Sequence, residues 1–345
     1  MYRTKAQSIY ALAANSLVED LQHYFVSQLN VLAGVQQDKS LFDAVEWFRD
    51  QGRHGGGVRY VANNGYVFNR ASVNVSHINY DENSSKSLAS ATALSTIIHP
   101  LNPHVPSVHM HISWTEMKDG TGYWRMMADL NPSVENEEVA LLFSNELKKV
   151  TPELYTIAAT QGDRYFFIPA LERHRGVSHF YLEEYNGDSV QADFNLAKKL
   201  GMTVINIYMA IFRQAILDYP NPADEDYNKQ LEYHTLYLFQ VLTLDRGTTS
   251  GLLVHDQNDV GIMGSLPAKI DKKLLSSWKE KLVAPQDQLL EAILTVLPDE
   301  QNCFIDETVK LALANVVRHH YRSNPKALAM QAQGNIIPPT VDNHK

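Results

Sequence analysis

Residues Arg53 to Tyr80 read RHGGGVRYVANNGYVFNRASVNVSHINY, and this stretch decides the fold class. After three glycines, apolar and polar residues alternate with a period of two, which is typical of half-buried strands. The segment Asn63-Asn64-Gly65 stands between two such runs and is a hairpin signal. The sequence therefore predicts two antiparallel strands joined by a tight turn, with a strand continuing over residues 72–80.

Hydrophobic periodicity and turn signals predict further strands and helices along the rest of the chain. Strands are predicted over residues 93–98, 107–115, 123–130 and 180–185, with a closing pair over 251–255 and 260–265. Helices are predicted over residues 7–34, 40–50, 134–150, 152–161, 192–219, 226–242, 278–282, 286–297 and 306–320. Because the strands come mostly in consecutive runs, the expected class is α+β with a mainly antiparallel sheet.

Composition excludes several functional classes. The chain has 345 residues, a net charge of −9 and scattered lysines and arginines, which argues against nucleic-acid binding. The most apolar stretch, residues 202–217, is too short for a membrane span and is predicted to be a buried helix. A single cysteine, Cys303, fits a reducing compartment, and the polar residues within the N-terminal helix pattern do not fit a signal peptide. A cytoplasmic protein is expected.

Three histidines form the first candidate site. In SVHMHISW, residues 107–114, alternation puts the apolar side chains on one face and His109, His111 and Ser113 on the other. His99 ends the preceding predicted strand, near the same polar face. Histidine is the usual proton donor or metal ligand near neutral pH. A metal site is the lower-ranked alternative, because no closely spaced carboxylate or cysteine completes the set.

Charged residues supply the other candidates. In LDRGTTSGLL, residues 244–253, Asp245 and Arg246 could hold opposite ends of a polar ligand, although an ion pair that caps a turn is equally compatible with the spacing. Asp129, before Leu-Asn-Pro, is either a turn residue or a site residue. Arginines matter only if they converge; the candidates are Arg49, Arg53, Arg59, Arg70, Arg125, Arg175 and Arg246.

Several of these stretches occur in an order that resembles one enzyme family. They are RHGGGVRYV, GYVFNRASVNVSHI, STIIHPLNPHVPSVHMHI, MADLNP, HRGVSHFYLEEYN, LDRGTTSGLL and GSLP. From about residue 47 to residue 267 they resemble oxygen-dependent coproporphyrinogen III oxidase, and IIHPLNPHVPSVHMH is the most specific segment. The resemblance implies a large, flat antiparallel sheet with helices on both faces and a homodimer. We expect one oxidase-like domain over residues 1–325 and a loose polar tail over 326–345.

The resemblance also implies a reaction. Two propionate side chains of coproporphyrinogen III lose carbon dioxide and become vinyl groups, which gives protoporphyrinogen IX. Molecular oxygen is the co-substrate, and no metal or organic cofactor is expected. The partner is thus a small tetrapyrrole, with no nucleic acid and no membrane span.

Site residues are implied by position in the same motifs. His109 matches the family's candidate proton donor, and Asp245 with Arg246 matches an Asp-Arg pair at the substrate. Substrate contacts are implied for Ser95, His99, His111, Ile112, Ser113, Asp129 and Arg175. The corner formed by Gly55, Gly56 and Gly57 is expected to let the backbone approach a broad macrocycle closely.

Departures from the family pattern fall at the site. Ser113 stands where the family has an arginine, and residues 255–258 lack the arginine of a Gly-Gly-Arg motif. Each charge-assisted contact contributes roughly 1.5–3 kcal/mol. A paralogue that acts on another substrate, or that binds a tetrapyrrole without turnover, is therefore the main alternative. Arg125 stands where the family has no arginine and is expected to compensate in part.

Overall fold

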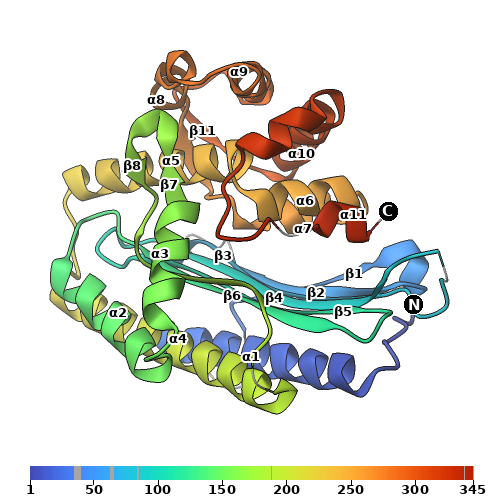
Figure 1. Cartoon of the computed structure of the whole chain (residues 1–345). Helices are drawn as coiled ribbons and strands as arrows, with labels where there is room; N and C mark the ends of the chain where they lie inside the picture. The colour runs from blue at the N-terminus through green and yellow to red at the C-terminus, as the bar shows by residue number, and fades with distance from the viewer. Residues whose placement is uncertain (35–39, 63–65, 84, 188, 338, 345) are drawn as a thin grey trace.

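The computed structural model describes residues 1–34, 40–62, 66–83, 85–187, 189–337 and 339–344. Its centre is a seven-stranded sheet in which every neighbouring pair is antiparallel (Figure 1). In spatial order the strands are β1 Asp43–Phe48, β2 Gly55–Ala62, β3 Phe68–Asn79, β4 Leu88–Pro100, β5 Ser107–Met117, β6 Gly122–Asn131 and β9 Val177–Tyr185. The expected α+β class with a large antiparallel sheet is confirmed.

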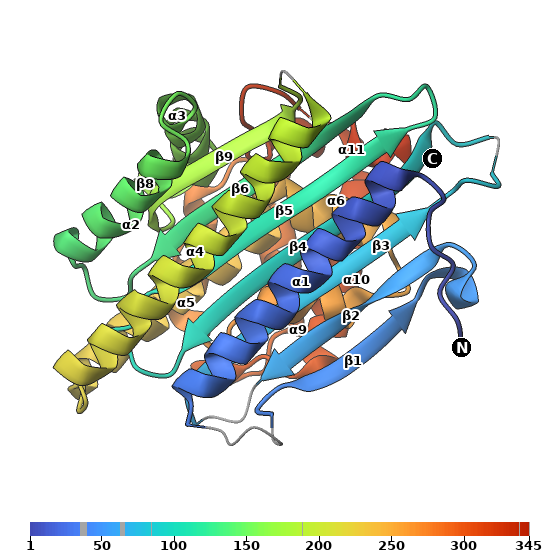
Figure 2. The ribbon, with the colours of Figure 1, turned by 90° about the horizontal axis from the view of Figure 1, so that it is seen from below.

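Two long helices cover one face of this sheet. α1 (Ile9–Leu32) and α4 (Val190–Asp218) run side by side along the strands, and α2 (Glu137–Val150) lies beside α4 (Figure 2). Buried apolar side chains from the helices and from the facing side of the strands form the larger hydrophobic core. By length and composition α4 could cross a membrane, but its inward face is part of this core, as expected for a buried helix.

A second layer of helices covers the opposite face (Figure 1). Its members are α5 Asp224–Thr243, α6 Arg246–Val254, α7 Asp259–Ile262, α8 Lys272–Ser277, α9 Gln286–Val296 and α10 Glu307–Ser323. They share a separate apolar core. Helices on both faces of the sheet are therefore confirmed. α3 (Tyr155–Phe166) packs on the edge strand β9.

Short elements complete the chain. Two small ladders pair β7 Phe167–Ile168 with β8 Arg173–His174, and β10 Lys269–Asp271 with β11 Asn302–Phe304. The 3-10 turns are η1 Arg49–Gly52, η2 Pro169–Leu171, η3 Met263–Ser265, η4 Lys279–Lys281 and η5 Pro325–Met330, and α11 is Thr340–Asn343.

Four predicted elements, two helices and two strands, differ from the structure. Residues 40–50, predicted as a helix, contain edge strand β1 and turn η1, because β1 satisfies its backbone hydrogen bonds against β2. Residues 251–265, predicted as two strands, lie in α6, α7 and η3, because the Asp245 carboxylate caps a helix that begins at Arg246. Residues 278–282 contain η4 in place of a longer helix. The predicted turn at residues 63–65 lies outside the described residues.

The C-terminal segment, expected to be loose, makes specific contacts in its described part. The Ala332 amide donates to the Leu244 carbonyl over 2.9 Å, and the Gln331 side chain donates to the Thr249 hydroxyl over 2.5 Å. The Lys86 ammonium donates to the His344 carbonyl over 2.8 Å. All of these contacts are hydrogen bonds of backbone or polar side-chain groups. The polar composition of the segment therefore could not predict that it is held in place.

The two faces of β5 provide a stability test. Ile112 is 0% exposed within the larger core, whereas Ser113 points to the opposite face. Ile112→Ala is expected to lower the free energy of unfolding by about 2–5 kcal/mol, because it leaves a cavity in that core. Ser113→Ala is the control and is expected to cost at most about 1.5 kcal/mol. Urea unfolding followed by circular dichroism measures both, and equal losses would contradict this assignment of faces.

Candidate active site

Polar side chains run across the sheet on the face that is covered by α5, α6 and α7. Residues paired across antiparallel strands point to the same side of the sheet, so the register defines rows. From β3 to β6 these rows are Ser72–Ile97–His109–Asp129, Asn74–Ser95–His111–Met127 and Ser76–Ala93–Ser113–Arg125. The predicted placement of His109, His111 and Ser113 on one face is confirmed.

A cavity of about 270 Å³ lies between this face and the helical layer. The strands form one wall, and the segment from Asp245 to Ser265 forms the opposite wall. Thr340 and His344 of the C-terminal segment also line it. The predicted site residues that the structure brings to this cavity are Ser95, His109, His111, Ser113, Arg175 and Asp245.

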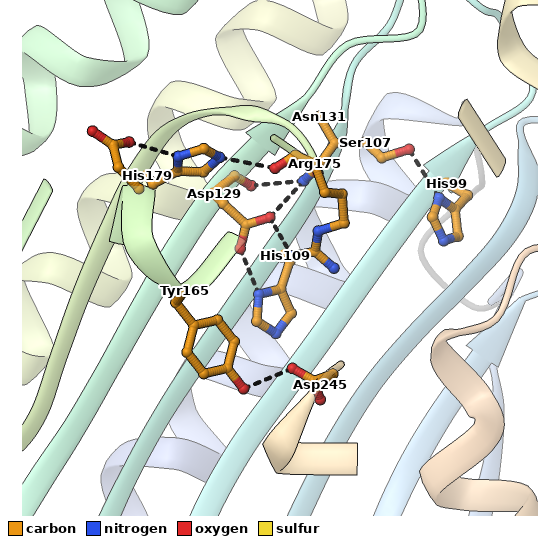
Figure 3. A network of polar contacts seen from close by, with 10 residues as sticks. His99, Ser107, His109, Asp129, Asn131, Tyr165, Arg175, His179 and Asp245 are labelled. Atoms are coloured by element: carbon orange, nitrogen blue, oxygen red, sulfur yellow. Dashed lines mark hydrogen bonds and ion pairs between the residues drawn. The ribbon is translucent and has the colours of Figure 1, made fainter. Parts of the chain in front are cut away.

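His109 is held from behind by a buried ion pair (Figure 3). Its Nδ1 lies 2.6 Å from Asp129 Oδ1, while Arg175 Nη2 donates to Asp129 Oδ2 over 2.8 Å. Burial by itself would raise the pKa of Asp129, but Arg175 and His109 outweigh it and hold that pKa below its usual value. The carboxylate is therefore an anion that accepts from His109 Nδ1, which leaves His109 Nε2 as the ring nitrogen available to a ligand.

The ion pair is part of a longer network. The Asn131 amide donates to Asp129 Oδ2 over 2.7 Å. His179 bonds the Arg175 carbonyl through Nε2 over 2.8 Å and the Asp163 carboxylate through Nδ1 over 2.8 Å. The Arg175 guanidinium also stacks 4.8 Å from the centre of the Tyr237 ring. Arg175 is thus fixed by contacts on several sides.

Asp245 faces His109 from the helical wall. As the N-cap of α6 it accepts the Thr248 amide on Oδ2 over 2.7 Å, and it accepts the Tyr165 hydroxyl on Oδ1 over 2.8 Å. Burial and the Asp245 charge raise the pKa of Tyr165, so the phenol stays protonated and donates. Each carboxylate oxygen has a second lone pair. Asp245 therefore remains an acceptor for N–H groups of a ligand.

A second ion pair lines the cavity beside β9. Arg125 Nε lies 3.1 Å from Glu183 Oε2, and the Tyr181 hydroxyl also donates to Glu183. Burial raises the pKa of Glu183, and Arg125 opposes this shift. The sequence analysis did not single out Glu183 or Tyr165. For Glu183, the available signal was a pair of glutamates that ends an apolar and aromatic run, FYLEEY.

His111 and two further histidines line the cavity as neutral groups. Burial and the nearby Arg125 lower the pKa of His111 well below its usual value. Burial, with His344 and Arg49, does the same to the pKa of His255, and it lowers the pKa of His344 to about 3. His255 and His344 were missed because nothing in their local sequence marks them.

Several predicted residues do not reach this cavity. Arg246 points to the C-terminal segment and donates to the carbonyls of Leu328 and Ala332 over 3.1 and 3.3 Å, because residues adjacent on a helix point about 100° apart. His99 is buried and bonds Ser107 Oγ over 2.9 Å. Burial, aided by His234, lowers the pKa of His99 well below its usual value.

Ile112 and Asp129 are two further predicted site residues that do not line the cavity. Strand alternation turns Ile112 into the core on the far face of the sheet. Asp129 is 0% exposed behind His109, so it acts on the cavity through that imidazole.

The glycine corner lies elsewhere. Gly55, Gly56 and Gly57 line a second cavity of about 390 Å³, beside the N-terminal segment. A Cβ on Gly57 would stand 1.9 Å from the Val75 carbonyl oxygen, and Gly55 has a φ of +90°. The glycines therefore allow β2 to pack closely against its neighbours in the sheet, which is a sufficient reason for their presence.

The alternative of a histidine metal site finds no support in the described residues. Among them, no group of three His, Cys, Asp or Glu side chains could hold a metal ion together. His99 is engaged with Ser107 and Ser265, and His111 bonds Ser113 over 3.0 Å.

The Asp129–Arg175 pair yields a double-mutant test. Arg175→Met leaves a buried carboxylate without its main counter-charge, which is expected to lower the free energy of unfolding at pH 7 by about 3–5 kcal/mol. The double variant Arg175→Met/Asp129→Asn is expected to recover much of that loss. A double variant no more stable than the single variant in urea unfolding would contradict the ion-pair account.

The same pair predicts a pH dependence. The depressed pKa of Asp129 stabilises the wild-type fold above the unfolded-state pKa, about 3.9, and this stabilisation is lost as pH falls. In Arg175→Met the buried carboxyl has a raised pKa and takes up a proton on mild acidification. The stability gap between wild type and variant should therefore be smaller at pH 5 than at pH 8, and a constant gap would count against this cause.

Comparison with known proteins places the chain in a family. The family model of coproporphyrinogen III oxidase matches residues 13–297. Mitochondrial oxygen-dependent coproporphyrinogen-III oxidase of Rattus norvegicus is 28% identical over 281 residues, covering 74% of this chain and 61% of the relative; that of Homo sapiens is 28% identical over 287 residues, covering 74% and 60%. Oxygen-dependent coproporphyrinogen-III oxidase of Prochlorococcus marinus strain MIT 9313 is 28% identical over 338 residues, covering 86% of this chain and 92% of the relative. The chain spans about three fifths of the length of the two mammalian relatives. Since the family match covers most of its residues, the chain belongs to the coproporphyrinogen III oxidase family.

Proposed function

We propose that this protein is an oxygen-dependent coproporphyrinogen III oxidase of heme biosynthesis, which forms protoporphyrinogen IX. The observation that carries the proposal is the cavity with His109 on its sheet wall and Asp245 on its helical wall, in a chain of this family. One wall offers an imidazole nitrogen and the other offers a carboxylate. The carboxylate can accept the pyrrole N–H groups of the substrate, and the imidazole can exchange a proton in the reaction.

The atoms and charges of the proposed reaction balance when molecular oxygen accepts the electrons. Each propionate loses carbon dioxide and a hydride equivalent from the carbon next to the ring, which leaves a vinyl group. The hydride equivalent and one proton reduce molecular oxygen to hydrogen peroxide, so each vinyl group consumes one proton. His109, oriented by Asp129, is the proposed donor of that proton through Nε2.

Asp245 is proposed to stabilise charge during the oxidation. As the carbon next to the ring loses its hydride equivalent, positive charge spreads into the pyrrole and reaches its N–H. A carboxylate that accepts this N–H is most favourable when that charge is largest, which lowers the barrier. The Tyr165 and Thr248 hydrogen bonds keep the Asp245 oxygens in place for this role.

The proposal extends to cofactor, location and assembly. Molecular oxygen accepts the electrons directly, so no metal or organic cofactor is included. The buried, single Cys303 is compatible with a reducing compartment, which supports the cytoplasm. A homodimer is proposed from the family resemblance.

One observation favours a second candidate, a paralogue that takes a substrate with fewer carboxylates or binds a tetrapyrrole without turnover. Both arginines that line the cavity already have a carboxylate partner, Arg125 with Glu183 and Arg175 with Asp129. A paired guanidinium binds a further carboxylate less strongly than a free one. Absence of turnover with retained coproporphyrin III binding would favour this candidate.

Asp245→Asn tests the proposed function. The amide keeps a side-chain oxygen for the α6 cap but removes the negative charge, so the variant should fold and lose at least about 100-fold in turnover. Purified protein is given chemically reduced coproporphyrinogen III in air, and oxidised products are separated by chromatography with fluorescence detection. Wild type should form protoporphyrin only when oxygen is present.

Asp271→Asn is the matched control. Asp271 caps α8 in the same way, through the Leu274 amide, and does not line the cavity. Its turnover should equal that of wild type. Full activity of Asp245→Asn would remove Asp245 from the reaction, and inactivity of wild type beside an active relative would refute the proposed activity.

A further inference from the structure

A buried group of three cationic side chains lies outside the chemistry described above. Arg59 of β2, Arg70 of β3 and Lys310 of α10 are 6%, 8% and 7% exposed. In two views α10 lies over the β2–β3 side of the sheet (Figures 1 and 2), and the charges of Arg59 and Arg70 act on Lys310. We call these three residues the basic cluster.

Within the described residues, the basic cluster lacks a direct counter-charge. Among the described residues no carboxylate oxygen lies within 4 Å of its nitrogens, in contrast to Arg125 and Arg175. Arg70 Nη2 donates to the Ile305 carbonyl over 2.9 Å, while the buried Nε atoms of Arg59 and Arg70 have no hydrogen-bond partner in the described part of the chain. Buried cations without partners are costly, and an anion would remove that cost.

The pKa shifts of these side chains agree with a site that favours an anion. Burial, with Arg70 and Arg59, lowers the pKa of Lys310 to about 7, and burial lowers the pKa of Arg70 to about 10. The nearest carboxylates, Asp306 and Glu307, are exposed and offset these shifts only in part. An anion among the three side chains would hold Lys310 in its charged form.

Through Arg59, the basic cluster reaches the cavity that contains His109 and Asp245. Arg59 pairs in register with Asn74, and this row continues through Ser95 to His111. Gly261 also lines the cavity, and a Cβ built on it would stand 2.5 Å from Arg59 Nη1. The absence of a side chain at Gly261 therefore brings the Arg59 guanidinium to the cavity wall.

We propose that Arg59, Arg70 and Lys310 form an anion-binding site that holds a carboxylate of the ligand in the cavity. The arginine fork suits a carboxylate, and Asn74, which pairs with Arg59 across the two strands, lines the cavity. The identity of the ligand as a tetrapyrrole carboxylate rests on the proposed function. With Arg125 and Arg175 already paired, the basic cluster is where a negatively charged side chain of the ligand gains most.

The test measures binding of coproporphyrin III, the stable oxidised tetracarboxylate, by fluorescence titration of the full chain. Arg59→Gln and Lys310→Met each remove one charge and keep an extended side chain. Each is expected to weaken binding by about 10-fold or more. Arg53→Gln, at an exposed arginine, is the matched control and should bind as wild type does. Equal affinities in all four proteins, or equal weakening in the control, would overturn the proposal.

A second readout separates the anion site from the proposed function. Citrate, compared with sodium chloride at equal ionic strength, should raise the melting temperature of wild type and of Arg53→Gln, but raise it less in Lys310→Met and Arg59→Gln. If the wild-type protein binds no coproporphyrin III, the proposed tetrapyrrole function is refuted. The difference in the citrate-induced melting shift between wild type and the cluster variants then still tests the anion site. Equal citrate shifts in all variants would overturn it.

Binding should also depend on pH through Lys310. Arg59 and Arg70 face its ammonium from the sheet, and Asp306 and Glu307 from the start of α10. An anion raises the pKa of Lys310, so binding takes up a proton, and affinity should fall as pH rises above about 7. Lys310→Met should lack this part of the pH dependence, and an identical pH profile in wild type and Lys310→Met would contradict a role for the ammonium.

Discussion

Asp129 lies fully buried near the end of β6, between the imidazole of His109 and the guanidinium of Arg175. Its charge persists in the interior because both partners come from elements that the sheet holds in register: β5 supplies His109, and the turn before β9 supplies Arg175. The carboxylate therefore joins two neighbouring strands to the edge of the sheet. It also sets the tautomer and orientation of His109, the proposed proton donor. Loss of this charge pair would disturb the fold and the site together.

The cavity lies between a wall of strands and a wall of helices. Strand register determines where Ser95, His109 and His111 stand, whereas Asp245 depends on the capped start of α6. Charges are distributed unevenly along this space. Near β6 and β9 the arginines are paired with carboxylates, but towards β2 and α10 the cations have no carboxylate within 4 Å among the described residues. A ligand with N–H groups and a separate anionic group could therefore donate to Asp245 on the helical wall and place its anion near the cations at the β2 end of the cavity.

The sequence predicted the central strands well, because each has one apolar face for the α1–α4 core and one polar face for the cavity. That alternation is visible without neighbours, and it assigned His109, His111 and Ser113 correctly to one side. Edge strand β1 was missed, since it is largely exposed and is stabilised by pairing with β2. Arg246 was paired with Asp245 by adjacency, but the helix start turns it to the C-terminal segment. Long-range contacts such as Tyr165 to Asp245 leave no local pattern in the sequence.

A crystal structure of the protein with coproporphyrin III tests the central claim most directly, namely that the cavity between the sheet and α6 is the tetrapyrrole site. The account predicts the macrocycle between His109 and Asp245, with pyrrole nitrogens directed at the Asp245 carboxylate and one propionate within hydrogen-bond distance of Arg59. A macrocycle seated instead beside Gly55, Gly56 and Gly57, in the cavity next to the N-terminal segment, would contradict it.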